Sequence, residues 1–235
     1  MTTLYVAGDS FASVSKTQAK GYSWSELLAT SLDVDLVNIA RPGASNLSIA
    51  IQIEWISQRI SKDDYAVVML TDHYRETLPS LTSLTNSNKN LLEKHSVHYT
   101  QVPYDGIEYS EPAELVSSIF TDDPAHKDYQ AFFKDWFHPE LAYFRDRMVI
   151  AGSVGLLARS TSRYVVCAGG FANGRENQTT TLTNLDLNIP SENFCEITSA
   201  WMTMTSANTD HGNHMDDRTH FQIANLLYKK VEKTS

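Results

Sequence analysis

The sequence predicts a three-layer α/β/α sandwich, in which helices cover both faces of a central parallel β-sheet. Short apolar runs alternate with helical patterns over residues 3–70, which is typical of βαβ units and a parallel sheet. The runs "YAVVML" and "YVVCAG" are continuously apolar or small, as expected of strands buried on both faces. No repeat or linker divides the chain, so we expect a single domain over residues 1–235.

Three strands and two helices are expected in the first third of the chain. The strands fall at residues 3–7, 34–40 and 65–70. The first helix is expected within residues 23–32, where apolar residues recur at helical spacing: Trp24, Leu27, Leu28 and Leu32. The second helix is expected to start near Asn46, and one of its faces carries Ile49, Ile53, Ile56 and Ile60.

Regular patterning stops between about residues 79 and 139, which we interpret as an insertion after the third strand with short helices of its own. A long helix follows, with an apolar stripe expected at Leu141, Phe144, Met148, Ala151 and Gly155. Strands are expected at 163–169 and 193–198, on either side of a polar loop at 170–192. The chain closes with a helix over 216–233, whose apolar face is expected to be Phe221, Ala224, Leu227 and Val231.

Composition excludes several classes of protein. The net charge is −9, and only 19 Lys and Arg are spread along the chain, so we expect no nucleic-acid partner. No apolar run reaches the length of a membrane span. No secretory signal precedes the first strand, which favours the cytoplasm, with a phage-encoded origin left open. Cys167 and Cys195 are expected to be buried, reduced thiols rather than a disulfide framework.

The groups that carry chemistry are expected where the parallel strands end. Gly8-Asp9-Ser10 follows the first strand, "ARPGASN" the second and "TDHYR" the third. A serine at such a turn is a poor nucleophile unless a base removes its proton. Three of the eight histidines fall within "HGNHMDDRTH", just before the last helix. Taken alone, Ser10 could instead cap a helix.

These segments resemble the SGNH, or GDSL-type, hydrolases. Gly8-Asp9-Ser10 resembles the nucleophile block of that family, and "VNIARPGASN" resembles its second block, with Asn38 ending the strand and Gly43 five residues later. "HGNHMDDRTHFQIANLL" resembles the last block. The resemblance implies a flavodoxin-like sheet and an esterase that needs no cofactor and no metal. It also implies small-molecule or carbohydrate ester substrates such as acetylated sugars, short-chain esters or lipids.

The resemblance also implies roles for individual residues. Ser10 would be the nucleophile, His214 the general base, and the N–H groups of Ser10 and Gly43 donors to the oxyanion. His211 or Asp210 would then orient His214, because no acid stands three residues before it. Asp217 and His220 have the family's acid-x-x-His spacing literally and form the alternative pair, although His220 would then lie in the first turn of the last helix.

The third block departs from the family pattern, which is Gly-x-Asn-Asp. Here Thr71, Asp72 and His73 stand in its place, and the simplest alignment puts His73 at the oxyanion-binding Asn. Asn46 is a second candidate donor, or the N-cap of its helix. Thr71 is retained as a substrate-side candidate. Loss of one oxyanion donor typically costs about 10²–10³ in rate.

Two other functions remain open on the sequence alone. A binding or structural module that has lost catalysis would explain the altered third block and the missing acid. A metal-dependent hydrolase could use His211, His214 and His220 with Asp210, Asp216 or Asp217. The aromatic residues of the insertion would suit a lid over the substrate or a contact in a homo-oligomer: Phe132, Phe133, Trp136 and Phe137.

Overall fold

A five-stranded parallel sheet forms the centre of the molecule. The computed structural model describes residues 2–9, 11–13, 23–41, 44–71, 75–78, 114–117, 135–169, 182–197 and 217–234. The strands are β1 (Thr3–Ala7), β2 (Asp35–Asn38), β3 (Tyr65–Met69), β6 (Tyr164–Gly169) and β7 (Phe194–Ile197). Their order is β2-β1-β3-β6-β7, and every neighbouring pair is parallel. Numbered within the sheet this is 2-1-3-4-5, the flavodoxin-like order.

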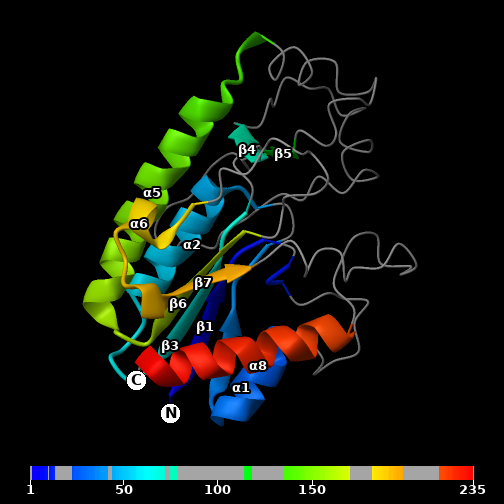
Figure 1. Ribbon diagram of the computed structural model, residues 1–235, viewed down its shortest axis with the longest axis vertical. Coiled ribbons are helices and arrows are strands. Elements are labelled where there is room, and N and C mark those ends of the chain that lie inside the picture. Colours follow the sequence, from blue (N-terminus) through cyan, green and yellow to red (C-terminus); the bar gives the residue numbers. More distant parts are fainter. Residues whose placement is uncertain are drawn as a thin grey trace.

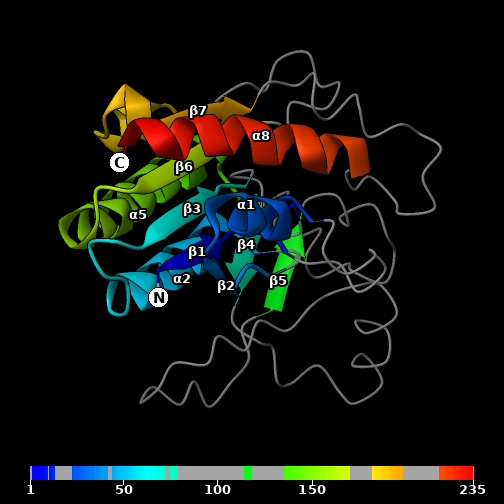
Figure 2. The ribbon, with the colours of Figure 1, turned by 90° about the horizontal axis from the view of Figure 1, so that it is seen from below.

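Helices cover both faces of this sheet. Helices α2 (Asn46–Ser57) and α5 (Pro139–Ser160) pack together on one face, and α1 (Trp24–Leu32) and α8 (Asp217–Thr234) pack together on the other (Figures 1 and 2). Successive residues of a strand point to opposite faces. In β3, Ala66 and Val68 therefore join the core under α2 and α5, whereas Val67 and Met69 join the core under α1 and α8. The predicted three-layer fold is confirmed.

Both helices of the first third start at a serine cap. Ser23 and Glu26 form a reciprocal capping box at the start of α1, which satisfies two of the N–H groups left open at a helix N-terminus. Ser45 caps α2, because its side chain accepts from Ser48 N at 3.3 Å. Asn46 is therefore the first residue of the helix and not its cap.

The apolar stripe predicted for α5 is wrong. Leu141, Phe144 and Met148 are 67%, 56% and 59% exposed. The buried side of the helix instead carries Ala142, Asp146, Ile150, Val154 and Leu157. Hydropathy alone selects the wrong stripe because the buried one contains a carboxylate, whereas the exposed one is made of large apolar residues.

Two further sequence expectations need correction. In α8, Phe221 is 59% exposed, and the buried side begins with Thr219 and His220. The region expected to be a polar loop contains a helical turn, α6 (Asn184–Leu187), and a 3₁₀ turn, η3 (Ser191–Asn193). Thr183 and Asp186 form a capping box that explains why this short polar segment is helical.

A separate antiparallel ribbon pairs β4 (Arg75–Leu78), just before the predicted insertion, with β5 (Glu114–Ser117), within it. The short helices expected elsewhere in the insertion, and the aromatic residues Phe132 and Phe133, lie outside the described residues. Trp136 is described and is 81% exposed. Among the described helices, none combines the length and the apolar character needed to cross a membrane.

Candidate functional site

The turn after β1 is shaped by Gly8. Its φ of +152° lies where side chains are rarely tolerated. A Cβ at this position would lie 2.7 Å from Ala12 Cβ and 2.9 Å from the Met69 carbonyl oxygen. The Gln52 side chain from α2 also brackets this residue, accepting from Gly8 N at 2.8 Å and donating to Gly8 O at 3.2 Å. The glycine lets the chain leave the sheet tightly against β3.

Asp9 organises the residues on both sides of position 10. Its carboxylate is fully buried and accepts from Phe11 N at 2.9 Å. Its carbonyl accepts from Ala12 N at 3.1 Å and Ser13 N at 3.0 Å, which forms a single helix-like turn. Its second carboxylate oxygen accepts from Thr71 Oγ1 at 2.9 Å. The backbone just before and just after position 10 is therefore held by Asp9, and through it by the end of β3.

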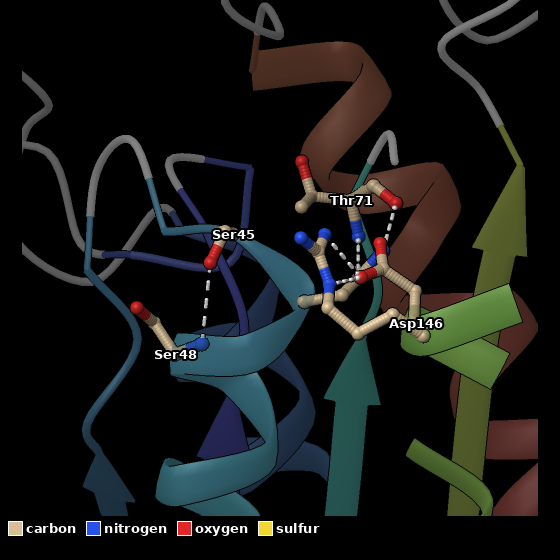
Figure 3. A network of polar contacts seen from close by, with 6 residues as sticks. Ser45, Ser48, Thr71 and Asp146 are labelled. Atoms are coloured by element: carbon tan, nitrogen blue, oxygen red, sulfur yellow. Dashed lines mark hydrogen bonds and ion pairs between the residues drawn. The ribbon is translucent and has the colours of Figure 1, made fainter. Parts of the chain in front are cut away.

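Thr71 is held in turn by Asn46, the first residue of α2. Asn46 Oδ1 accepts from Thr71 N at 3.0 Å, and Asn46 Nδ2 donates to Thr71 O at 2.9 Å. The same Nδ2 donates to Asp146 Oδ2 at 2.8 Å. Arg145 completes this network, shown in Figure 3, by binding Asp146 Oδ1 through Nη2 at 2.7 Å and Nε at 3.0 Å.

The end of β2 joins the same turn through Asn38. Asn38 Nδ2 donates to Ala12 O at 2.8 Å and to Ser25 Oγ at 3.1 Å. Its Oδ1 accepts from Ala40 N at 3.0 Å. Beyond it, Arg41 N donates to Gly8 O at 3.0 Å. The asparagine at the end of the second strand thus fixes the far side of the turn.

The last helix reaches this turn through Trp24. His220 Nδ1 accepts from Trp24 N at 3.0 Å, across 196 residues of sequence. The Trp24 indole Nε1 donates to Phe11 O at 2.7 Å. Both side chains are buried. A backbone N–H can only donate, so Nδ1 is the unprotonated ring nitrogen of His220.

Two predicted site residues are found in other roles. An amide has two N–H hydrogens, and in this structure those of Asn46 are donated to Thr71 O and Asp146 Oδ2. Thr71 uses its N–H for Asn46 and its hydroxyl for Asp9, so it is part of the scaffold of the turn. Six others lie outside the described residues: Ser10, Gly43, His73, Asp210, His211 and His214.

Sequence reasoning missed Gln52, Asp146 and the bridging role of Trp24. Gln52 and Asp146 sit at ordinary helical positions, and no motif marks them. The one available signal was a charged residue in register with the apolar positions Ala142, Ile150 and Val154. The described part of the chain contains no group of three His, Cys, Asp or Glu side chains that could bind a metal ion.

Two solved structures resemble this chain across almost its whole length. One is a member of the lipolytic protein G-D-S-L family from Veillonella parvula, 11% identical, with a TM-score of 0.47 and coverage of 96% of this chain and 95% of that one. The other is the psychrotrophic esterase EstA from a Pseudoalteromonas species, 11% identical, with a TM-score of 0.49 and coverage of 99% and 98%. No protein-family model matches the chain, and no curated protein has a significantly similar sequence.

Proposed function

We propose that the protein is a serine hydrolase that cleaves carboxylic esters, with Ser10 as the nucleophile and His214 as the general base. One observation carries the proposal. The turn around position 10 is hydrogen-bonded to residues of the second segment that resembles a hydrolase block and of the segment that stands in place of the third: Asn38 binds Ala12 O, and Thr71 binds the Asp9 carboxylate. The last resembling segment is linked to the same turn indirectly, because His220 binds Trp24 N and the Trp24 indole binds Phe11 O. A turn that served only to cap a helix would not need this support.

The proposed reaction proceeds by acyl transfer. Ser10 Oγ attacks the acyl carbonyl carbon while His214 takes its proton, and the carbonyl oxygen becomes an oxyanion. The N–H groups of Ser10 and Gly43 bind that oxyanion. When the intermediate collapses, the ester C–O bond breaks and His214 returns the proton to the leaving alcohol. Water then attacks the acyl-enzyme in the same way, which releases the carboxylic acid and restores Ser10.

The hydrogen bonding of His220 supports His214 as the base. In a serine triad the base carries a proton on Nδ1, which it donates to an orienting partner. Nδ1 of His220 accepts from Trp24 N instead. His220 is therefore proposed to anchor α8, and either His211 or Asp210 is proposed to orient His214. His73 remains the candidate for the third oxyanion donor, because Asn46 and Thr71 are occupied.

Fluorophosphonate labelling followed by peptide mass spectrometry tests the proposal. We expect one adduct, on Ser10, that is lost in Ser10→Ala and His214→Ala but kept in His220→Asn. Short-chain p-nitrophenyl esters and acetylated sugars then provide a first substrate screen.

Failure of the folded wild-type protein to form an adduct would overturn the proposal. It would favour the alternative, a binding or structural module on this fold. Labelling that survives His214→Ala but is lost in His220→Asn would instead assign the base to the Asp217–His220 pair.

A further inference from the structure

We infer that Asp146 is a positioning residue for the turn at residues 9–13, which contains the proposed nucleophile, although it lies on α5, outside every segment that resembles a hydrolase block. The inference rests on the proposed function, because it assigns Asp146 a part in the reactivity of Ser10. The carboxylate acts through a chain of buried hydrogen bonds that runs from Asp146 through Asn46 and Thr71 to Asp9.

The burial of Asp146 calls for an explanation. Its side chain is completely buried, and a buried carboxylate is costly unless it is paired and hydrogen-bonded. Its ionic partner is its neighbour in sequence, Arg145, whose side chain is 36% exposed. Adjacent residues of a helix do not normally face each other, so the guanidinium folds back onto Oδ1. This leaves Oδ2 directed at α2.

Asp146 and the backbone of Thr71 favour the same orientation of the Asn46 amide. A carboxylate can only accept hydrogen bonds, so Asn46 must turn Nδ2 toward Asp146 and Oδ1 toward Thr71 N. In this orientation the amide binds both the N–H and the C=O of Thr71, at 3.0 and 2.9 Å. A flipped amide would put its oxygen against a carboxylate and its N–H₂ against a backbone N–H. Asp146 thus strengthens the orientation that clamps Thr71 and holds the Asn46 side chain in place from the α5 side.

The clamped residue lies between two parts of the proposed machinery. Thr71 Oγ1 donates to Asp9 Oδ2, and Asp9 Oδ1 accepts from Phe11 N, so the clamp reaches the residues on both sides of Ser10. In sequence, Thr71 is followed directly by Asp72 and His73, and His73 is the candidate for the third oxyanion donor. Small displacements of either segment are costly to acyl transfer, because reacting groups must be aligned within a fraction of an ångström.

Asp146→Asn is the informative variant, because it preserves shape and removes one acceptor. The network needs two acceptors, one for Arg145 and one for Asn46, whereas an amide supplies a single oxygen. We expect the maximal rate of fluorophosphonate labelling at Ser10 to fall between about 10- and 100-fold, with little change in the probe concentration at half-maximal rate. Hydrogen exchange at the Thr71 and Phe11 amides should become faster.

Asp64→Asn is the matched control. Asp64 is also a buried carboxylate, and it accepts from Thr3 N at 2.7 Å and Ser61 N at 2.8 Å. It lies just before the start of β3, whereas Thr71 lies just after the end of that strand. We expect this variant to lose stability while the labelling rate of its folded form stays at the wild-type value.

The outcomes separate the two proposals. An unreactive wild-type protein would overturn the proposed function and this inference with it. A reactive wild type with an equally reactive Asp146→Asn would overturn the inference alone. So would an equal loss of rate in Asp64→Asn, because that would show a general effect of stability. If Asp146→Asn does not fold, Thr71→Val removes the next link isosterically, and wild-type labelling in Thr71→Val would overturn the inference.

Discussion

His220 Nδ1 accepts a hydrogen bond from Trp24 N at 3.0 Å, which ties the first turn of α8 to the first turn of α1. The N–H groups in the first turn of a helix have no partner within the helix. Here a histidine from the other end of the chain supplies the acceptor. The same tryptophan binds Phe11 O through its indole, so α8 and the turn at residues 9–13 are both bound to Trp24.

His220→Ala should lower the free energy of unfolding by roughly 2–4 kcal/mol, because it leaves a buried N–H without an acceptor and opens a cavity. His220→Asn should lose clearly less, since an asparagine oxygen can occupy the place of Nδ1. Urea unfolding of both variants measures the difference. Equal losses in the two variants would contradict the role assigned to Nδ1.

Gly8→Ala should destabilise the protein by roughly 2–4 kcal/mol, because its Cβ would meet the Met69 carbonyl oxygen and the backbone would have to leave a φ of +152°. Gly155→Ala provides a control of opposite sign. Nothing lies within 4 Å of a Cβ at Gly155, and alanine is favoured over glycine within a helix by about 0.5–1 kcal/mol. Thermal unfolding of the two variants should therefore shift the melting temperature in opposite directions.

Cys167 and Cys195 lie opposite each other on β6 and β7 as buried free thiols, as predicted. A hydrogen bond from Cys167 lowers the pKa of Cys195, against the opposing effect of burial, and Lys230 adds to the lowering. The same hydrogen bond and burial raise the pKa of Cys167 well above its usual value.

Cys167→Ala should therefore raise the pKa of Cys195, because its thiolate loses a donor. Cys167→Ser should leave the pKa of Cys195 lower than in Cys167→Ala, since a hydroxyl can still donate. Each variant retains a single cysteine of the original two, so thiolate absorbance against pH reports Cys195 alone. A higher pKa in the serine variant would contradict the hydrogen-bonding account.

Asp64 should make the free energy of unfolding depend on pH in the acidic range. Burial alone would raise the pKa of its carboxyl, but hydrogen bonds from Ser61 and from Thr3 N outweigh burial and hold the pKa below its usual value. The Asp64 carboxyl thus binds a proton less readily in the folded state than in the unfolded state. Its contribution to the free energy of unfolding is therefore complete above the unfolded pKa of about 4 and is lost as pH falls through the folded pKa. The difference in unfolding free energy between wild type and Asp64→Asn should shrink below about pH 4. A constant difference would exclude this linkage.

The centre of the sheet was predictable from sequence because β3 and β6 are continuous runs of apolar or small residues. "YAVVM" of β3 is buried at four of its five positions, and no other reading fits so short a run beside helical patterns. The proximity of Asn38 to the turn after β1 was also expected, since the carboxyl ends of parallel strands lie at the same side of a sheet. The buried side of α5 was not predicted, because it includes the Asp146 carboxylate. That burial is tolerable only because Arg145 and Asn46 bind the carboxylate.

The hydrogen bonds that support the turn after β1 could not be predicted from sequence. Motifs predicted Ser10 and the histidine segment as site residues, and these stay predictions, whereas one partner of Asn46 is a residue 100 positions away. A single sequence gives no indication that those two positions meet. Asn46 therefore looked like a free donor at a strand end, when its amide is committed to Thr71 and Asp146.

The Asn46–Asp146 contact restricts how this chain can diverge. A hydrophobic residue in place of Asp146 would leave the Asn46 amide with an unmatched N–H, and a change at Asn46 alone would strand a buried carboxylate. Either single step is unfavourable, and a joint replacement must also provide new partners for the Thr71 N–H and C=O that Asn46 binds. Descendants of this sequence should therefore carry both residues or neither, so this one contact should persist or vanish as a unit over evolutionary time.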